Sequence, residues 1–234
     1  MSVFEIQSKL RAFASEENAR TALWFFKTGP GEYGEGDQFI GVRAPDLRRL
    51  AKELKATPIA DCLQLLQSPI HEDRSLALLI LVHAFTKGDA IAKQKIYEAY
   101  LQHTDYINNW DLVDISAPHI VGAYLFDQSR TPLYELAKSN SLWERRIAII
   151  ATQHFIRQKD FDDTLQIAKL LLYDKHDLIQ KAVGWMLREI GNRDFAVEEA
   201  FLQQHYNTMP RTMLRYAIEK FPEPKRQAYL KGTI

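Results

Sequence analysis

A weak internal repeat of about 35 residues is the feature that most limits the folds open to this chain of 234 residues. The segment Asp73–Leu79 is similar to Glu144–Ile150, which lies 71 residues, or two periods, further on. Steps of 35, 36, 35 and 35 residues connect five anchor positions, each near the start of a predicted helix: Arg74, Asn109, Arg145, Gln180 and Arg215. Such a period is typical of helical solenoids, in which paired helices stack and only neighbouring repeats touch.

Helical patterning extends over almost the whole chain. Apolar residues recur with a period of about 3.6 and predict helices at 3–14, 17–27, 45–54, 58–66, 71–85, 89–102, 111–124, 132–138, 142–157, 161–172, 177–189, 194–205, 211–220 and 224–230. The one long irregular stretch, residues 28–37, holds four of the ten glycines and is predicted to be a loop. With no convincing strand or linker, the pattern predicts an all-α solenoid of HEAT-like repeats forming a single domain over residues 1–234.

The repeat register brings unusual residues onto one face. The position after each anchor reads Ser75, Trp110, Arg146, Lys181 and Tyr216, and four residues later come Leu79, Asp114, Ile150, Trp185 and Lys220. Equivalent positions of successive repeats align on one face of a solenoid. Core positions are aliphatic, as at Leu76, Ile115, Ile147 and Ala182. A row that contains two indoles, a carboxylate and two cations indicates a functional surface.

Trp110 and Asp114 are the candidate reactive pair. Residues four apart lie on the same face of a helix, so the indole and the carboxylate stand together. This combination stabilises a positive charge that develops between the two groups. The alternative is structural, with Asp111 capping the helix, Trp110 packed in the core and Asp114 solvated.

Charge neither requires nor excludes a polyanionic partner, because the formal net charge is zero. The first 117 residues are slightly acidic and the remainder slightly basic. Six cations at equivalent or neighbouring helical positions are candidates for binding nucleic-acid phosphates: Arg145, Arg146, Lys181, Arg188, Arg211 and Arg215. The alternative for each is a solvated salt bridge, with Glu144 and Glu189 as obvious partners.

Other sequence features favour a cytoplasmic, soluble protein. Cys62 is the only cysteine, so no internal disulfide forms, and the scattered histidines lack metal-ligand spacing. We expect Cys62, His83, His119 and His154 to be structural. Residues 1–5 do not resemble a signal peptide, and no apolar run reaches the roughly 18 residues of a membrane span.

Five segments resemble the AlkD-like DNA alkylation repair family and cover nearly the whole chain in the family's order. They are Phe39-Ile40-Gly41-Val42-Arg43-Ala44-Pro45-Asp46-Leu47-Arg48-Arg49, Asn109–Asp114, Leu142–Ile149, Gln180–Glu189 and Pro210–Ile218. The resemblance implies a right-handed, HEAT-like superhelix whose concave face binds double-stranded DNA. It also implies a monomeric, monofunctional DNA glycosylase that removes N3- and N7-alkylated purines without base flipping, and without a metal or an organic cofactor.

The resemblance also implies roles for particular residues. Asp114 would be the catalytic carboxylate, Trp110 and Trp185 would flank the deoxyribose, and Arg146 would grip a backbone phosphate. An aromatic residue of an early helix, Trp24 or Phe25, would line the same site.

The chemistry agrees with these residues, because an N7- or N3-alkylated purine already carries a positive charge and leaves without a general acid. A carboxylate and two indoles then stabilise the oxocarbenium-like sugar. Without a lysine nucleophile, no strand-nicking step is expected.

Other functions remain open. One is a catalytically silent solenoid that binds DNA or a protein partner, although such a scaffold needs no Trp110, Asp114 and Trp185 in register. Another is a glycosylase for neutral lesions, which is disfavoured because no second acid is evident. The loop at residues 28–37 either approaches the minor groove or obstructs the cleft.

Overall fold

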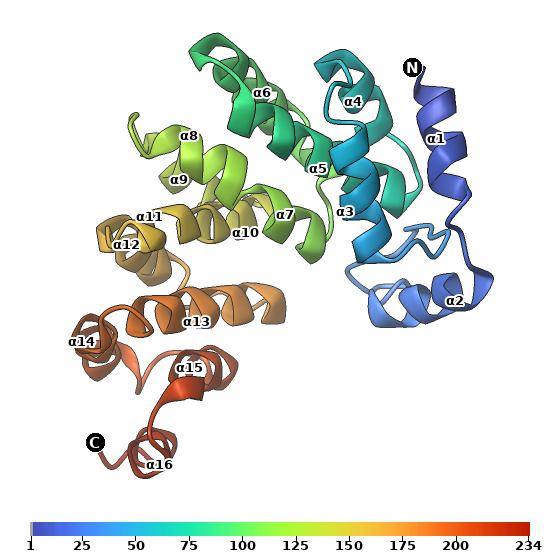
Figure 1. Ribbon diagram of the computed structural model, residues 1–234. Coiled ribbons are helices and arrows are strands. Elements are labelled where there is room, and N and C mark those ends of the chain that lie inside the picture. Colours follow the sequence, from blue (N-terminus) through green and yellow to red (C-terminus); the bar gives the residue numbers. More distant parts are fainter. Residues whose placement is uncertain (1) are drawn as a thin grey trace. The chain divides into compact units, whose positions relative to one another are not determined.

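The computed structural model describes residues 2–234 and is built from helices (Figure 1). Over that range, β-type pairing is limited to one isolated parallel bridge between Gln38 and Ile70. The predicted all-α class is therefore confirmed. The chain divides into two compact units, the first ending at Ile120 and the second beginning at Val121.

Helix α5 (His71–Lys87) is the central helix of the first unit. It packs against α3, α4, α6 and α7. The other elements of the unit are α1 (Val3–Arg11), α2 (Glu16–Phe25), α3 (Ala44–Glu53), α4 (Ile59–Leu66), α6 (Ala90–Gln102), a 3-10 turn (Thr104–Tyr106) and α7 (Trp110–Ser116). Leu76, Leu78 and Leu81 are at most 1% exposed although they point to different faces of α5. A helix that is apolar on several faces belongs in the interior of a unit.

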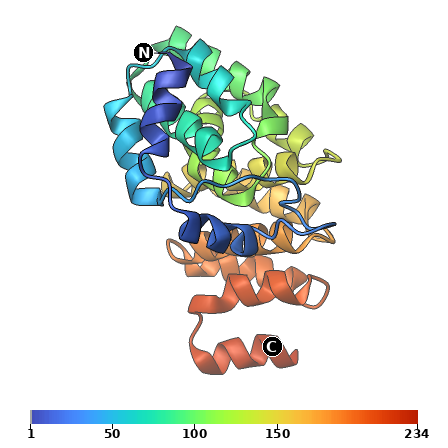
Figure 2. The ribbon, with the colours of Figure 1, turned by 90° about the vertical axis from the view of Figure 1, so that its right-hand side faces the viewer.

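Helix α13 (Asp177–Gly191) has the corresponding place in the second unit. It packs against α10, α12, α14 and α15. The elements of this unit are α8 (Ala123–Leu125), α9 (Thr131–Leu136), α10 (Leu142–Ala151), α11 (Gln153–Arg157), α12 (Asp162–Leu170), α14 (Phe195–His205), α15 (Arg211–Ala217), a 3-10 turn (Ile218–Lys220) and α16 (Glu223–Lys231). Gly184 lets α13 approach α15 closely, because a Cβ there would lie 2.4 Å from the carbonyl oxygen of Met213. Figure 2 shows the helices of both units from a second side.

The sequence repeat of about 35 residues corresponds to a similar turn before each of the helices α5, α10 and α13. Arg74 Nη1 donates to the carbonyl of Ser68 at 3.1 Å, and Arg145 Nη1 donates to the carbonyl of Ser139 at 3.0 Å. Gln180 Nε2 donates to the carbonyl of Asp174 at 3.0 Å in the same way. Each anchor side chain therefore reaches back six residues and closes the turn at the start of its helix.

The first residue of each of these turns completes the motif. The side chains of Ser68, Ser139 and Asp174 each accept a hydrogen bond from the backbone N–H two residues later, at 3.1, 3.0 and 2.8 Å. We call this pair of hydrogen bonds the turn clamp. It satisfies backbone groups that the helix itself leaves unpaired at its start.

Most predicted helices are observed with ends shifted by only a few residues, but two are divided into separate helices, and the predicted helix at 211–220 ends in a 3-10 turn. The predicted helix at 111–124 becomes α7, a π turn at Pro118–Gly122 and α8. Pro118 has no N–H to donate to the carbonyl four residues earlier, so the regular ladder stops there. The predicted helix at 142–157 is divided at Thr152, whose hydroxyl donates to the carbonyl of Ile149 at 2.6 Å.

The predicted core positions are mostly confirmed. Leu76, Ile147 and Ala182 are at most 1% exposed. Ile115 is only half-buried, because it lines the cleft described next. Residues 28–37 form turns without a helix, as predicted, with Gly31 and Gly36 at φ values of 78° and 82°.

Candidate functional site

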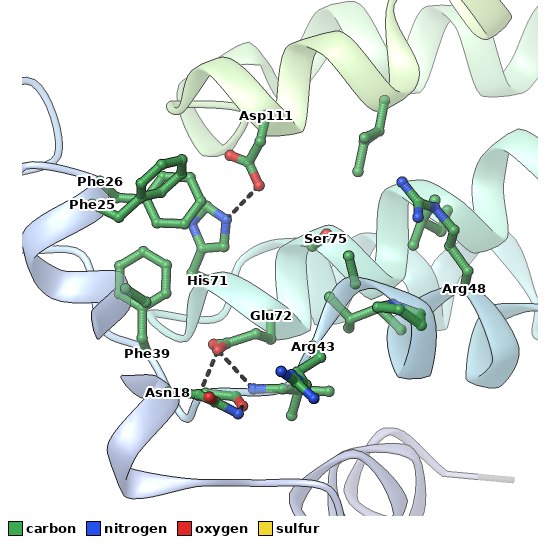
Figure 3. Close-up of a pocket in the computed structure, with 18 of the residues that line it drawn as sticks. Asn18, Phe25, Phe26, Phe39, Arg43, Arg48, His71, Glu72, Ser75 and Asp111 are labelled. Atoms are coloured by element: carbon green, nitrogen blue, oxygen red, sulfur yellow. Dashed lines mark hydrogen bonds and ion pairs between the residues drawn. The ribbon is translucent and has the colours of Figure 1, made fainter. Parts of the chain in front are cut away.

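A cleft of about 740 Å³ opens in the first unit between α2, α3, α5 and α7 (Figure 3). Its size lies within the usual range of small-molecule and cofactor sites. The lining residues with aromatic, charged or amide side chains are Asn18, Phe25, Phe26, Phe39, Arg43, Arg48, His71, Glu72, Trp110, Asp111 and Asp114. Both members of the predicted pair, Trp110 and Asp114, therefore line the same cleft.

Helix α7 positions this pair because it begins at Trp110 itself. Asn109 precedes the helix, and its side-chain oxygen accepts a hydrogen bond from the backbone N–H of Trp110 at 2.8 Å. Trp110 and Asp114 are both half-buried, so each presents part of its side chain to the cleft. The alternative of a fully packed Trp110 does not hold.

Aromatic rings support the indole from the side of α2. The Phe26 ring stacks on Trp110 with centroids 5.5 Å apart and an interplanar angle of 25°. Phe25 approaches Trp110 edge-on at 5.9 Å. Phe39 continues the stack, with its centroid 5.0 Å from Phe26 and 4.5 Å from His71. The orientation of Trp110 is thus set by a packed column of rings.

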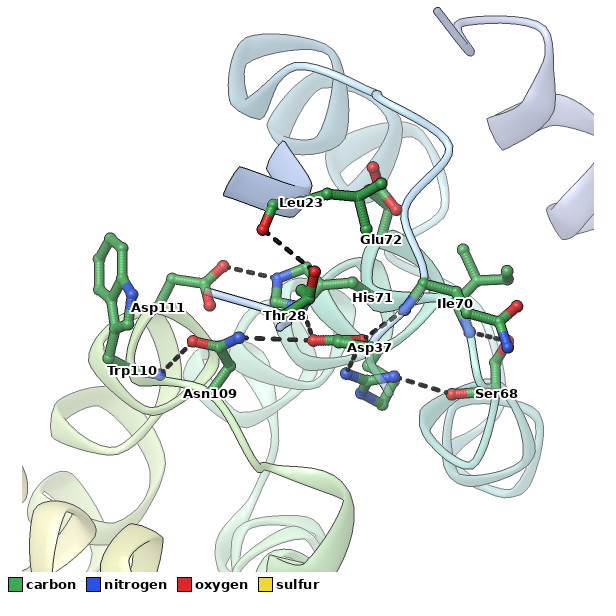
Figure 4. A network of polar contacts seen from close by, with 12 residues as sticks. Leu23, Thr28, Asp37, Ser68, Ile70, His71, Glu72, Asn109, Trp110 and Asp111 are labelled. Atoms are coloured by element: carbon green, nitrogen blue, oxygen red, sulfur yellow. Dashed lines mark hydrogen bonds and ion pairs between the residues drawn. The ribbon is translucent and has the colours of Figure 1, made fainter. Parts of the chain in front are cut away.

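Beneath the rings, His71 connects the glycine-rich loop to α7 (Figure 4). Its Nδ1 lies 2.8 Å from Asp37 Oδ2, and its Nε2 lies 2.9 Å from Asp111 Oδ2. Arg74 Nη2 donates to the other oxygen of Asp37 at 2.7 Å. Asn109 Nδ2 makes a longer contact of 3.4 Å with Asp37. Because both ring nitrogens face carboxylates, the cationic imidazole fits this site.

The network changes the acidity of its members. Burial alone would lower the pKa of His71, but the charges and hydrogen bonds of Asp111 and Asp37 raise it to about 9. Burial alone would raise the pKa of Asp37, but His71 and Arg74 hold it below its ordinary value. At neutral pH, two carboxylates and two cations therefore balance in the buried network.

Glu72 organises the opposite wall. Its carboxylate accepts hydrogen bonds from the backbone N–H groups of Ile40, Gly41 and Val42, at 2.7 Å for Gly41. Gly41 has a φ of 79°, and a Cβ there would lie 2.1 Å from the carbonyl oxygen of Ser15. This arrangement leads the chain into α3, so that Arg43 and Arg48 line the cleft.

In the second unit, several residues predicted to bind DNA have partners within the unit. Arg145 donates to Asp174 at 2.7 Å in addition to closing its turn clamp. Arg146 is 5% exposed and donates to the carbonyl of Leu178 at 2.7 Å. Lys181 pairs with Asp177 at 2.5 Å, and Arg188 pairs with Glu219.

The remaining predicted residues are more accessible. Arg211 is exposed and donates to the carbonyl of Leu230 at 2.7 Å, and Arg215 is exposed. Trp185 is half-buried, with its Nε1 3.3 Å from Glu189 Oε1. Trp24 is 82% exposed on α2, whereas its neighbour Phe25 lines the cleft. The roles predicted for these residues stay predictions.

The sequence did not reveal several cleft residues. Phe26 and Phe39 lie in the segment between α2 and α3, and His71 begins α5, so local periodicity cannot show that they meet. Arg43 and Arg48 lie in the segment Phe39–Arg49, whose family-like pattern was the available signal. Residues 2–234 contain no group of three or more His, Cys, Asp or Glu side chains that could hold a metal ion.

Comparison with known proteins establishes the family. The family model described as "DNA alkylation repair enzyme" matches residues 6–221. The chain belongs to this family. The predicted resemblance is thereby confirmed, and the cleft is that of a DNA alkylation repair family member. A search of curated proteins finds no match.

A solved structure supports the fold of this family member. It is described as a predicted DNA alkylation repair enzyme from Enterococcus faecalis, and it matches with a TM-score of 0.68 and 17% sequence identity. The match covers 90% of this chain and 97% of the other. At this identity the similarity concerns the fold, and it agrees with a solenoid of helical repeats. In the described part of the chain, no helix has the length and apolarity to cross a membrane.

Proposed function

We propose that this family member is a DNA glycosylase that hydrolyses the N-glycosidic bond of positively charged, N3- or N7-alkylated purines in double-stranded DNA. The observation that carries the proposal is the position of Trp110 and Asp114 side by side on α7, both lining the cleft of a DNA alkylation repair family member. The lesion's own charge makes its base a good leaving group, so the site needs no general acid.

The chemistry at the sugar follows from these two side chains. When the bond from C1′ to the purine nitrogen breaks, its electron pair leaves with the base and positive charge develops on the sugar. The Asp114 carboxylate and the face of Trp110 stabilise that charge electrostatically. Water adds to C1′ and gives up a proton, which Asp114 accepts, leaving an abasic sugar and the free base. Trp185 is proposed as a second aromatic wall on the strength of the family resemblance.

The cleft's construction supports this role for the indole. A ring that stabilises a cation must hold its face toward the sugar before the bond breaks, because reorganisation during the reaction would cost free energy. The stack of Phe26 on Trp110 supplies that preorganisation. Since the cation forms in the backbone sugar, the base need not be rotated into a pocket, which agrees with a mechanism without base flipping.

The deciding experiment is release of 7-methylguanine from methylated duplex DNA under single-turnover conditions. Wild type is compared with Asp114→Asn and with Asp105→Asn, a matched control at an exposed carboxylate of the 3-10 turn. We expect release by wild type and by Asp105→Asn. Release by Asp114→Asn should fall at least about a hundredfold while DNA binding is retained. The abasic product strand should stay intact.

Two results would contradict the proposal. Equal rates for Asp114→Asn and wild type would remove the carboxylate from the mechanism. A folded wild-type protein that binds duplex DNA but releases no alkylated base would favour the alternative, a catalytically silent helical-repeat scaffold.

A further inference from the structure

Two arginines of the cleft differ from the other arginines around it. Arg43 and Arg48 line the cleft, and both are exposed. Within residues 2–234, neither guanidinium forms a hydrogen bond or ion pair with another residue. Their neighbour Arg49 is engaged instead, with Asp46 at 2.8 Å and over the Phe13 ring at 5.0 Å. The cleft therefore contains two guanidinium groups with no internal counter-charge.

Two of the three carboxylates that line the same cleft are engaged with other groups. Asp111 is paired with the cationic His71, and Glu72 accepts its hydrogen bonds from three backbone N–H groups. Figure 3 shows Phe25, Phe26 and Phe39 on one side of the cleft, with Arg43 and Arg48 on the other. One side is thus suited to a sugar or base, and the other to an anion.

The backbone favours an anion at the same place. Helix α3 has ten residues, and no side chain caps its N-terminus, which begins directly after Arg43. Pro45 has no N–H, and the N–H groups of Asp46 and Leu47 donate to the carbonyl of Arg43 at 3.0 and 3.1 Å, so this helix start contributes the positive end of its dipole. A guanidinium also presents several donors in one plane, which matches the geometry of a phosphate.

We propose that Arg43 and Arg48 bind the backbone phosphate next to the nucleotide whose deoxyribose contacts Trp110 and Asp114. The inference rests on the proposed function, because that function places the sugar at α7. A sugar and its adjacent phosphate are covalently connected, so one cleft must accommodate both. The volume of about 740 Å³ is sufficient for them. The arginines fix the position of the strand, and the carboxylate and indole act on the sugar.

The test measures DNA binding without base excision. The probe is a duplex containing one tetrahydrofuran abasic-site analogue, and its dissociation constant is measured by fluorescence anisotropy across a range of salt concentrations. Wild type is compared with the double variant Arg43→Gln/Arg48→Gln and with Arg49→Gln, a matched control on the same helix. Circular dichroism and thermal melting establish that each variant is folded.

We expect the double variant to bind at least about tenfold more weakly at low salt, because two cation–phosphate contacts are lost. The slope of log K against log salt should become shallower by about 1.8 units. Arg49→Gln should match wild type. If the double variant matched wild type in affinity and slope, the proposal would be overturned.

A second probe locates the phosphate. Uncharged methylphosphonates replace the two phosphates that flank the tetrahydrofuran residue. This replacement should weaken wild-type binding by about the same factor as the double substitution, and it should have little further effect on the double variant. If the methylphosphonates weakened binding by the same factor in wild type and in the double variant, the arginines would contact other phosphates and the proposal would be overturned.

The outcomes separate this inference from the proposed function. Wild type could release no alkylated base while the methylphosphonates weaken binding by wild type but not by the double variant. That result would support the phosphate site and contradict the glycosylase activity. If wild type releases base and the double variant binds and reacts like wild type, the glycosylase stands and the phosphate site fails.

Discussion

His71 Nε2 lies 2.9 Å from Asp111 Oδ2, in the first turn of the helix that carries Trp110 and Asp114. The other ring nitrogen of His71 contacts Asp37, at the end of the glycine-rich loop. A single buried imidazole therefore joins three segments that are distant in the sequence. The imidazole therefore helps to hold α7, and with it the candidate site, in place.

We predict that this network makes stability pH-dependent. The folded-state pKa of His71 is about 9, above its ordinary value of 6.5. Its contribution is therefore fully present below pH 6.5 and is lost as the pH rises through about 9. His71→Gln should lower the free energy of unfolding at pH 6 by on the order of 2–3 kcal/mol, with a smaller difference from wild type at pH 9.5. Urea denaturation at the two pH values measures this, and a pH-independent difference would contradict the prediction.

Trp24 and Trp110 differ in solvent exposure, so we expect their replacement by alanine to have different effects. Trp24→Ala should change stability by less than about 0.5 kcal/mol, because its ring is 82% exposed. If Trp24 contacts DNA as predicted from the family, the substitution weakens duplex binding. Trp110→Ala should cost on the order of 2 kcal/mol, because it removes the stacking partner of Phe26. Thermal melting and anisotropy of the two variants test both statements, and unaltered DNA affinity in Trp24→Ala would refute its predicted role.

Gly41→Ala should be strongly destabilising, by on the order of 3 kcal/mol. Its φ of 79° disfavours a side chain, and the added Cβ would lie 2.1 Å from the carbonyl oxygen of Ser15. Gly31→Ala is a matched control, because its φ is 78° but no atom lies within 4 Å of the added Cβ. The control should cost only about 1 kcal/mol. Equal losses in the two variants would mean that the backbone conformation, and not the contact with Ser15, causes the effect.

A buried carboxyl group in the second unit should reduce stability at high pH. Glu198 is 2% exposed, its Oε1 has no hydrogen-bond partner, and burial raises its pKa to about 8. The folded protein holds this proton more tightly than the unfolded chain, so the contribution of Glu198 becomes less favourable as the pH rises from 4.5 to about 8. Glu198→Gln should therefore be more stable than wild type at pH 9, by on the order of 2 kcal/mol, and nearly equal to it at pH 4.5. Denaturant titrations at both pH values decide this, and a variant less stable at pH 9 would contradict the assignment.

Local signals in the sequence predicted the helices and the proximity of Trp110 to Asp114. Helix ends follow from caps such as Ser15 and Asp89, and the proximity of Trp110 to Asp114 follows from helical geometry alone. These features depend on residues close together in the chain, which is why they could be predicted.

The rest of the cleft depends on contacts across long sequence separations. His71 meets Asp111 across 40 residues, and Asp37 across 34. The glycine content of residues 28–37 predicted a loop, but not that Asp37 would be buried with Arg74. Likewise, the register placed Arg146 in a row with Trp110 and Asp114, yet spacing could not show its hydrogen bond within the second unit.

The turn clamp also bears on how such a chain diversifies. Each clamp draws its hydrogen bonds from within a single turn, so a repeat carries its own closure when it is copied. The residue after the anchor is not used by the clamp and differs each time: Ser75, Arg146 and Lys181 follow Arg74, Arg145 and Gln180. The clamp therefore leaves the next position available for another contact, as at Arg146, whose guanidinium donates to the carbonyl of Leu178.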